Sequence, residues 1–151
     1  MKHNQALQLV KYLCEQVRSL EALKAYRSLA KCPLLVAAKL GIHEIIEEIV
    51  NSFPRAILAK DSEDRNIFQL VVIKHHENVF NLLYQMGEYK QYITRLEDNN
   101  GNTLLHLVGN QAPIEKLNVV PGAALQIQRE LQWFKVIQYI FLFQGLITDV
   151  C

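Results

Sequence analysis

Apolar residues recur at alternating steps of four and three along residues 5–20, at Ala6, Val10, Leu13, Val17 and Leu20. This spacing predicts an amphipathic helix. The stripe covers about two heptads, whereas a coiled coil needs about three to four. We therefore expect this helix to belong to an N-terminal cap, residues 1–31, that packs on the next element of the fold.

A repeating pattern begins at Cys32. Runs of similar residues occupy 32–50 and 66–83 and begin 34 positions apart, and a third run begins at Thr103, 37 positions after the second. Each of the first two runs reads as a short helix, a turn and a longer helix. A period in the low thirties with this order of elements is typical of ankyrin repeats.

These runs predict an all-α solenoid of about three degenerate ankyrin repeats, with flanking N- and C-terminal helices. The repeats occupy residues 32–112, with units at about 32–65, 66–102 and, in part, 103–112. Each unit buries its apolar face only against its neighbours, so we expect the flanking helices to act as caps.

Several residues of the repeats have a physical reason to stand where they do. Pro33 fits the first helical position, where a missing N–H costs nothing. Ala37 and Ala38 are small enough to let neighbouring helices approach closely. Gly41 can adopt a positive φ and end the first helix. Thr103 and His106 stand where the ankyrin consensus has Thr-Pro-Leu-His, and we expect hydrogen bonds between them to tie the turn to its helix.

Polar, turn-forming stretches precede the second and third runs, and we take them as the hairpin tips of the array. Ankyrin-type arrays present such tips to other proteins, and these tips are acidic on balance. They predict a binding surface for a protein partner with a basic segment, while ordinary solvated turns are the alternative. The candidate partner-binding residues are Asp61, Ser62, Glu63, Asp64, Arg65, Asp98, Asn99 and Asn100.

After Gly109 the repeat pattern can no longer be recognised in the sequence. Pro113 and the Pro121-Gly122 pair predict a loop, followed by a helix from about Ala123 to Val136. Arg129 and Trp133 lie on a face next to the apolar stripe that we expect this helix to bury. The stripe consists of Ala124, Ile127, Leu131 and Phe134. We assign residues 113–135 to this loop and helix.

Residues 3–135 resemble the plant ankyrin-repeat proteins that end in a membrane-embedded PGG domain. The resemblance rests on the repeat cores, on the runs 4–14 and 64–69, on Asn-Gly-Asn-Thr-Leu-Leu-His-Leu at 100–107, and above all on Pro-Gly-Ala-Ala-Leu-Gln-Ile-Gln-Arg-Glu-Leu-Gln-Trp-Phe-Lys at 121–135. It implies the cytoplasmic arm of a membrane-anchored protein of stress and defence signalling. Residues 136–151 depart from the family, which continues with a further repeat motif and membrane helices. We interpret them as a divergent apolar tail, the product of a retained intron or a truncated gene model.

Composition excludes several classes of protein. The chain has 151 residues, and half of them are hydrophobic, which argues against a disordered chain. Its formal net charge of +1 argues against electrostatic binding of nucleic acid. The apolar run 136–147 is shorter than the roughly 20 residues of a membrane span. Three unpaired, widely spaced cysteines favour a reducing compartment. We therefore expect a cytoplasmic chain without a transmembrane span.

Residues that could carry chemistry do not form a recognisable motif. His75 and His76 are adjacent, a poor spacing for a metal chelate, and no phosphate-binding or nucleophile motif occurs. Cys32 falls on the consensus Thr position, where we expect a small buried side chain. We predict a non-catalytic protein–protein interaction module with no cofactor and no metal. The alternatives are a self-assembling helical module that uses residues 5–20 or 139–143, and, more remotely, a thiol-dependent enzyme that uses Cys32.

Overall fold

Every regular element of the computed structural model is helical within the residues that it describes, which are 2–17, 32–85, 89–110, 112–117 and 122–148. In those ranges the pairing of extended backbone is limited to one isolated bridge, between Lys60 and Asn66. The prediction of an all-α fold is confirmed.

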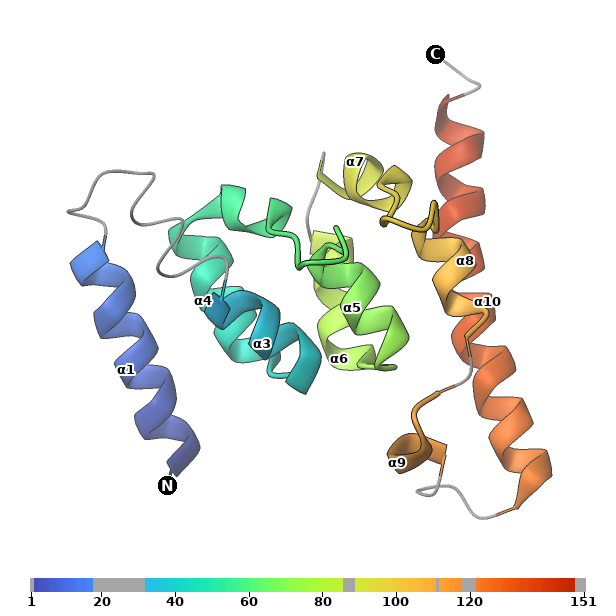
Figure 1. The fold of residues 1–151 in the computed structure, drawn as a ribbon, viewed down its shortest axis with the longest axis horizontal. Coiled ribbons are helices and arrows are strands. Elements are labelled where there is room, and N and C mark those ends of the chain that lie inside the picture. Colours follow the sequence, from blue (N-terminus) through green and yellow to red (C-terminus); the bar gives the residue numbers. More distant parts are fainter. Residues whose placement is uncertain (1, 18–31, 86–88, 111, 118–121, 149–151) are drawn as a thin grey trace.

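The helices of the central part form two rows. In the first row, α3 (Cys32–Leu40) packs against α5 (Ile67–Ile73), and α5 packs against α8 (Leu104–Val108) (Figure 1). In the second row, α4 (His43–Ser52) pairs with α3, and α6 (Glu77–Phe80) pairs with α5. The second-row helices also contact each other, so each helical pair is covered by the next.

One long helix flanks each end of these rows (Figure 1). Helix α1 (Lys2–Val17) packs on α4, and α10 (Ala123–Thr148) packs on α8. Short helices fill the connections: the 3-10 helices η2 (Pro54–Leu58) and η3 (Asn81–Gln85), and the α-helices α7 (Tyr89–Arg95) and α9 (Ile114–Leu117).

The turns that end α3 and α5 share one design. Gly41 and His75 both have positive φ, +74° and +52°. The residue after each of them donates its N–H five positions back, from Ile42 to Ala37 O and from His76 to Val71 O, both at 3.0 Å. This bond belongs to the Schellman motif, in which a residue of positive φ closes a helix. The prediction for Gly41 is confirmed, and its counterpart stands 34 residues further on.

Small and branched residues line the contact between the first-row helices. Ala37 and Ala38 of α3 are buried, as are Val71 and Val72 of α5. The close approach predicted from the two alanines is confirmed. A Cβ added to Gly41 would overlap the imidazole of His76, so the turn after α3 and the turn after α5 are also packed tightly.

The N-terminal helix buries a different face from the one predicted. Cys14 is 1% exposed and Val10 packs against the core, but Ala6 and Leu13 are exposed. The prediction for Ala6 and Leu13 was therefore wrong. Helix α1 meets α4 along a narrow line, on whose edge Lys11 Nζ lies 3.8 Å from Glu48 Oε2. Residues 18–20 of the predicted stripe lie outside the described residues.

The C-terminal helix is longer than predicted and is turned differently. It continues past Val136 to Thr148, through most of the segment that we interpreted as a tail. The helices from α3 to α8, which we call the array, contact the neighbouring face of α10, where Trp133 and Ile137 are buried. The predicted stripe is exposed instead, at Ala124, Ile127, Leu131 and Phe134. Trp133 packs there against the rings of His75 and Phe80.

Candidate functional site

The first predicted hairpin tip, residues 60–66, is a turn folded around one carboxylate. Asp61 Oδ1 accepts hydrogen bonds from the N–H groups of Glu63 (2.9 Å) and Arg65 (3.0 Å). The N–H of Asp61 donates to Arg65 O at 2.9 Å and closes the turn. Asp64 has a φ of +60°, a conformation that Asp and Asn tolerate better than other side chains. Asp61 is thus a structural acceptor inside its own loop.

The second tip, residues 97–103, repeats the same bonds 37 residues later. Asp98 Oδ1 accepts from the N–H groups of Asn100 and Asn102, both at 2.9 Å, and the N–H of Asp98 donates to Asn102 O at 3.0 Å. Gly101, with a φ of +75°, takes the position of Asp64. Two different sequences therefore fold into one backbone design.

Each loop leads into a helix through a capping box, a reciprocal pair of bonds at the helix N-terminus. Asn66 accepts from the N–H of Gln69 at 3.0 Å, and Gln69 Oε1 accepts from the N–H of Asn66 at 2.9 Å. In the next unit, His106 Nδ1 accepts from the N–H of Thr103 at 3.2 Å and lies 2.8 Å from its hydroxyl. The predicted tie between Thr103 and His106 is confirmed.

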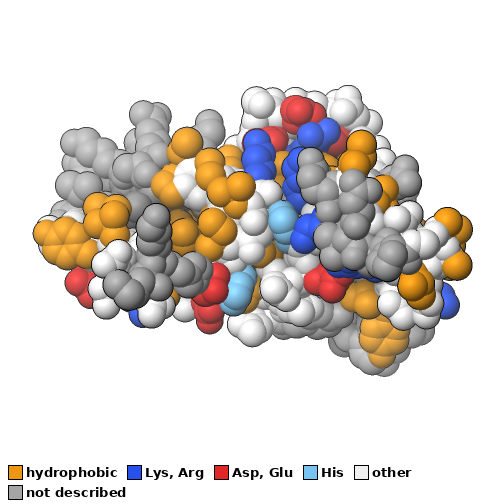
Figure 2. Space-filling model, turned by 90° about the horizontal axis from the view of Figure 1, so that it is seen from below, with side chains coloured by type: hydrophobic (Ala, Val, Ile, Leu, Met, Phe, Trp, Pro, Cys, Tyr) orange, Lys and Arg blue, Asp and Glu red, His pale blue; other side chains and the backbone are white. Residues whose placement is uncertain are grey.

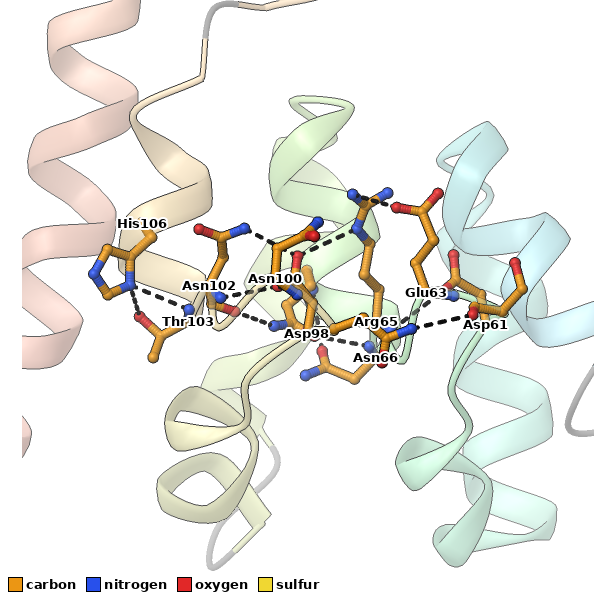
Figure 3. A network of polar contacts seen from close by, with 12 residues as sticks. Asp61, Glu63, Arg65, Asn66, Asp98, Asn100, Asn102, Thr103 and His106 are labelled. Carbon is orange, nitrogen blue, oxygen red and sulfur yellow. Dashed lines mark hydrogen bonds and ion pairs between the residues drawn. The ribbon is translucent and has the colours of Figure 1, made fainter.

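The two loops are joined to each other by polar contacts (Figure 3). Arg65 bridges them, with Nη2 at 2.6 Å from Glu63 Oε2 and Nε at 3.5 Å from Asp98 Oδ2. The backbone N–H of Asn99 donates to Glu63 O at 3.1 Å. Gln69 Nε2 donates to two carbonyls of the following loop, Leu96 O (3.2 Å) and Asn102 O (3.0 Å).

The Asp98 carboxylate is held in its charged form. Burial raises the pKa of this group. Hydrogen bonds lower the pKa by more than burial raises it, and they come from the backbone and side chain of Asn102, from the backbone of Asn100 and from Arg65. The pKa of Asp98 therefore lies below its ordinary value. A buried carboxylate with this many donors belongs to the framework that positions the loops.

The structure separates the eight predicted tip residues into three groups. Asp61, Asp98 and the Arg65 guanidinium face inward and hold the two loops, whereas Asp64 is partly buried with Lys60 Nζ at 2.6 Å from Oδ2. The residues exposed for a partner are Ser62, Glu63, Asn99 and Asn100. The acidic side chains are largely matched by bases, since Lys39 Nζ also lies 3.9 Å from Asp61 Oδ2.

A second polar cluster, which the sequence did not predict, joins the array to α10. His75 is 7% exposed, and its Nε2 lies 3.4 Å from Asn110 O and its Nδ1 3.5 Å from Glu130 Oε1. Trp133 packs on the rings of His75 and Phe80, with centroids 5.5 and 5.3 Å away. Burial lowers the pKa of His75, against the opposing effect of Glu130. The positive φ of His75 could not be foreseen, because a Gly usually marks such a turn.

Residues with metal or thiol chemistry are dispersed. His76 Nε2 lies 2.9 Å from Lys39 O, a different partner from those of His75, and burial lowers the pKa of His76. Across the ranges that the structure describes, no three His, Cys, Asp or Glu side chains are grouped in a way that could hold a metal ion. Cys32 is exposed at the start of α3, so the prediction of a buried side chain was wrong.

Comparisons with protein-family models, with curated proteins and with solved structures gave no match to this chain. In the described part of the chain, none of the helices combines the length and the apolar character that crossing a membrane requires.

Proposed function

We propose that the chain is a degenerate ankyrin-type solenoid that recognises another protein and carries out no catalysis. The observation that supports this proposal most is the loop design at 60–66 and 97–103, repeated bond for bond at a spacing of 37 residues. Stacked units of one design, each contacting its neighbour, are the architecture of solenoid repeat proteins, which bind partners along an extended surface.

The loop edge is the part of this surface that favours partner binding. Ser62, Glu63, Asn99 and Asn100 are exposed, while the groups that hold the loops rigid lie behind them. A surface held rigid before binding loses less conformational entropy when the partner arrives. In the proposed complex, the backbone bonds around Asp61 and Asp98 keep the exposed side chains in place.

The charges of this edge favour a basic segment in the partner. Four acidic groups, Asp61, Glu63, Asp64 and Asp98, are paired with the three bases Lys39, Lys60 and Arg65, which leaves one negative charge. Glu63 is the most exposed of these four acids, since its side chain is 53% exposed. By the resemblance to the plant ankyrin family, we propose a cytoplasmic signalling partner in stress or defence.

The side chains that could act as general acids or bases have structural roles, which favours binding over catalysis. The carboxylates of Asp61 and Asp98 accept backbone N–H groups, and His106 closes a capping box. A general acid or base must instead reach a substrate proton within hydrogen-bond distance. These side chains are held by bonds within the loops and, for Asp98, by Arg65 of the neighbouring loop.

The test compares the exposed edge with an equally exposed site elsewhere. A Ser62→Lys, Asn100→Lys double variant changes the edge charge by +2 and leaves Asp61, Asp98 and the Glu63–Arg65 pair, which hold the loops, in place. Glu47→Lys, on the exposed side of α4, is the matched control. In quantitative pull-downs, proteins recovered by the wild type and by the control should be lost with the double variant, and their recovery by the wild type should fall with added salt. Equal recovery by all three chains would reject the loop edge.

A further inference from the structure

A hollow of about 300 Å³ lies between the turns after α3 and α5 and the helices α9 and α10. The two turns and α9 lie on the lower side of the molecule in Figure 1, and Figure 2 views that side. A histidine lies in the middle of this face with Lys and Arg side chains beside it, while hydrophobic side chains gather toward both ends (Figure 2). The lining includes His75 and His76 from the second turn, Lys116 from α9 and Arg129 from α10. Basic groups from separate parts of the chain therefore meet around one hollow.

The bases at this hollow lack the acidic partners that the bases of the loop edge have. On the loop edge, Lys39 Nζ and Lys60 Nζ lie 3.9 and 2.6 Å from carboxylate oxygens of the first loop. Among the residues that the structure describes, Lys116 has no ion-pair partner, and neither has Lys74, which directly precedes the two histidines. The hollow therefore carries positive charge that the fold itself does not neutralise.

The one acid that lines the hollow offsets this charge only in part. Glu77 Oε1 lies 3.5 Å from Arg129 Nη2, and the two side chains are 55% and 38% exposed. An exposed pair of this kind contributes little free energy, so the guanidinium can bind another anion. Glu130 does not line the hollow, and its carboxylate is engaged by His75 Nδ1 at 3.5 Å and by the N–H of Ala112 at 3.3 Å.

The imidazole of His76 senses the excess of positive charge. Burial lowers its pKa most, a hydrogen bond to Lys39 O raises it, and the charges of Lys116 and Lys74 lower it further. An anion in the hollow would oppose the effect of the two lysines. The pKa of His76 would then rise, so this side chain can report on binding.

The size and the lining of the hollow indicate a small, highly polar anion. A volume of about 300 Å³ is at the lower end of the range for small-molecule sites. Leu40 is the one large apolar side chain among the described residues of the lining, so the hollow offers little to a hydrophobic ligand. The guanidinium of Arg129 presents a planar fork of donors that fits carboxylate or phosphate oxygens. Lys116, Arg129 and the nearby Lys74 exceed Glu77 by two charges, which matches a phosphate monoester, close to a dianion at pH 7, better than a single carboxylate.

We propose that this hollow binds the phosphate group of a small soluble molecule. Arg129 and Lys116 bind the phosphate oxygens, and Lys74 adds to the attraction from beside the hollow. The inference does not depend on the proposed function of the loop edge, which lies on other loops.

The test follows the histidine side-chain NMR signals of the full chain while inorganic phosphate replaces chloride at constant ionic strength. The signals of His76, identified by their loss in His76→Gln, should shift and saturate, and the pKa of His76 should rise. Lys116→Gln should weaken phosphate binding about tenfold, because it removes a charge-assisted contact. Two controls should bind nearly as the wild type does: Lys116→Arg, which keeps the charge, and Arg95→Gln, which removes an exposed base on α7.

Three results would overturn the proposal. The first is the absence of a saturating shift of the His76 signals. The second is an equal affinity of Lys116→Gln and the wild type, or an equal loss of affinity in Lys116→Gln and Arg95→Gln. The third concerns the source of the phosphate: sedimentation of the chain with phosphatidylcholine vesicles that contain phosphatidic acid, without any response to inorganic phosphate, would exclude a small soluble ligand.

Discussion

Gln69 and His106 occupy the same place in two consecutive units, where each closes the capping box of its helix. Gln69 is completely buried, and its amide also donates to Leu96 O and Asn102 O of the next loop. His106 is exposed and bonds with Thr103 alone among the described contacts. The inner unit is therefore joined to the loop of its neighbour, whereas the outer unit uses the same residue position only for itself.

The difference separates two tasks that one loop design performs. Holding the loop needs a carboxylate that accepts backbone N–H groups, and both Asp61 and Asp98 supply it. Joining one loop to the next needs donors that reach across, and Arg65 and Gln69 of the inner unit supply these together with the backbone N–H of Asn99 from the outer loop. Variants at paired positions of the two units can therefore measure each task separately.

The largest effect is expected at the carboxylate that serves both tasks. Asp98→Ala leaves the N–H groups of Asn100 and Asn102 without their acceptor and removes the acid beside Arg65, and its side chain has no exposed surface. We expect a loss of about 3 kcal/mol in the free energy of unfolding. Asp61→Ala removes the bonds within its loop and a 3.9 Å ion pair with the half-exposed Lys39, and it should cost about 1 kcal/mol. Urea denaturation measures both, and equal losses would show that the contact between the loops adds no stability.

The next effect compares the two capping-box residues. Gln69→Ala removes the bond to Asn66 and leaves two carbonyls of the second loop without their donor, so we expect a loss of about 2 kcal/mol. His106→Ala opens an exposed capping box and should cost about 0.5 to 1 kcal/mol. If the His106 variant proves the less stable of the two in the same urea experiment, the bonds from Gln69 to the next loop add no stability.

The sequence was sufficient to predict features that local chemistry determines. The turn at Gly41 and the tie between Thr103 and His106 depend on residues within a few positions of each other, and the small size of Ala37 and Ala38 was enough to place them in a contact between helices. The faces buried by α1 and α10 were predicted wrongly. Apolar periodicity shows that a helix has an apolar face, but here the rings of His75 and Phe80 on another element selected Trp133.

The candidate site shows the same division between local and tertiary information. The sequence placed the eight tip residues in turns, but it could not divide them into exposed and inward-facing groups. That division comes from Arg65 and Asp98, 33 positions apart, which meet only when the two units stack. The junction at His75 was missed because its partner Glu130 lies on α10, beyond the repeats.

A smaller effect is expected from the residues of positive φ. Gly101→Ala meets no other atom within 4 Å, so its cost is that of the backbone conformation, about 1 kcal/mol. In the first loop, Asp64→Gly relieves the same conformation but loses the contact with Lys60. We expect this variant to be more stable by about 0.5 kcal/mol. Thermal unfolding of the two variants should thus move in opposite directions; a shift of both in the same direction would mean that the loops do not share one conformation.

The smallest effect is the contribution of Asp98 to the pH dependence of stability. Burial raises the pKa of this carboxyl, but the donors from Asn102, Asn100 and Arg65 lower it below the ordinary 3.8. A carboxyl whose pKa is lower in the folded state binds fewer protons there than in the unfolded state. Its stabilising contribution is therefore complete above pH 3.8 and is lost as the pH falls through the folded value. Asp98→Asn should flatten urea stability measured between pH 5 and 2.5, and an unchanged slope would mean that Asp98 takes up its proton equally in both states. Burial also lowers the pKa of His75 and His76, so the stability that their neutral forms contribute is lost as the pH falls from about 6.5 through their folded pKa values. Because the Asp98→Asn variant keeps both histidines, its difference from the wild type isolates the contribution of Asp98.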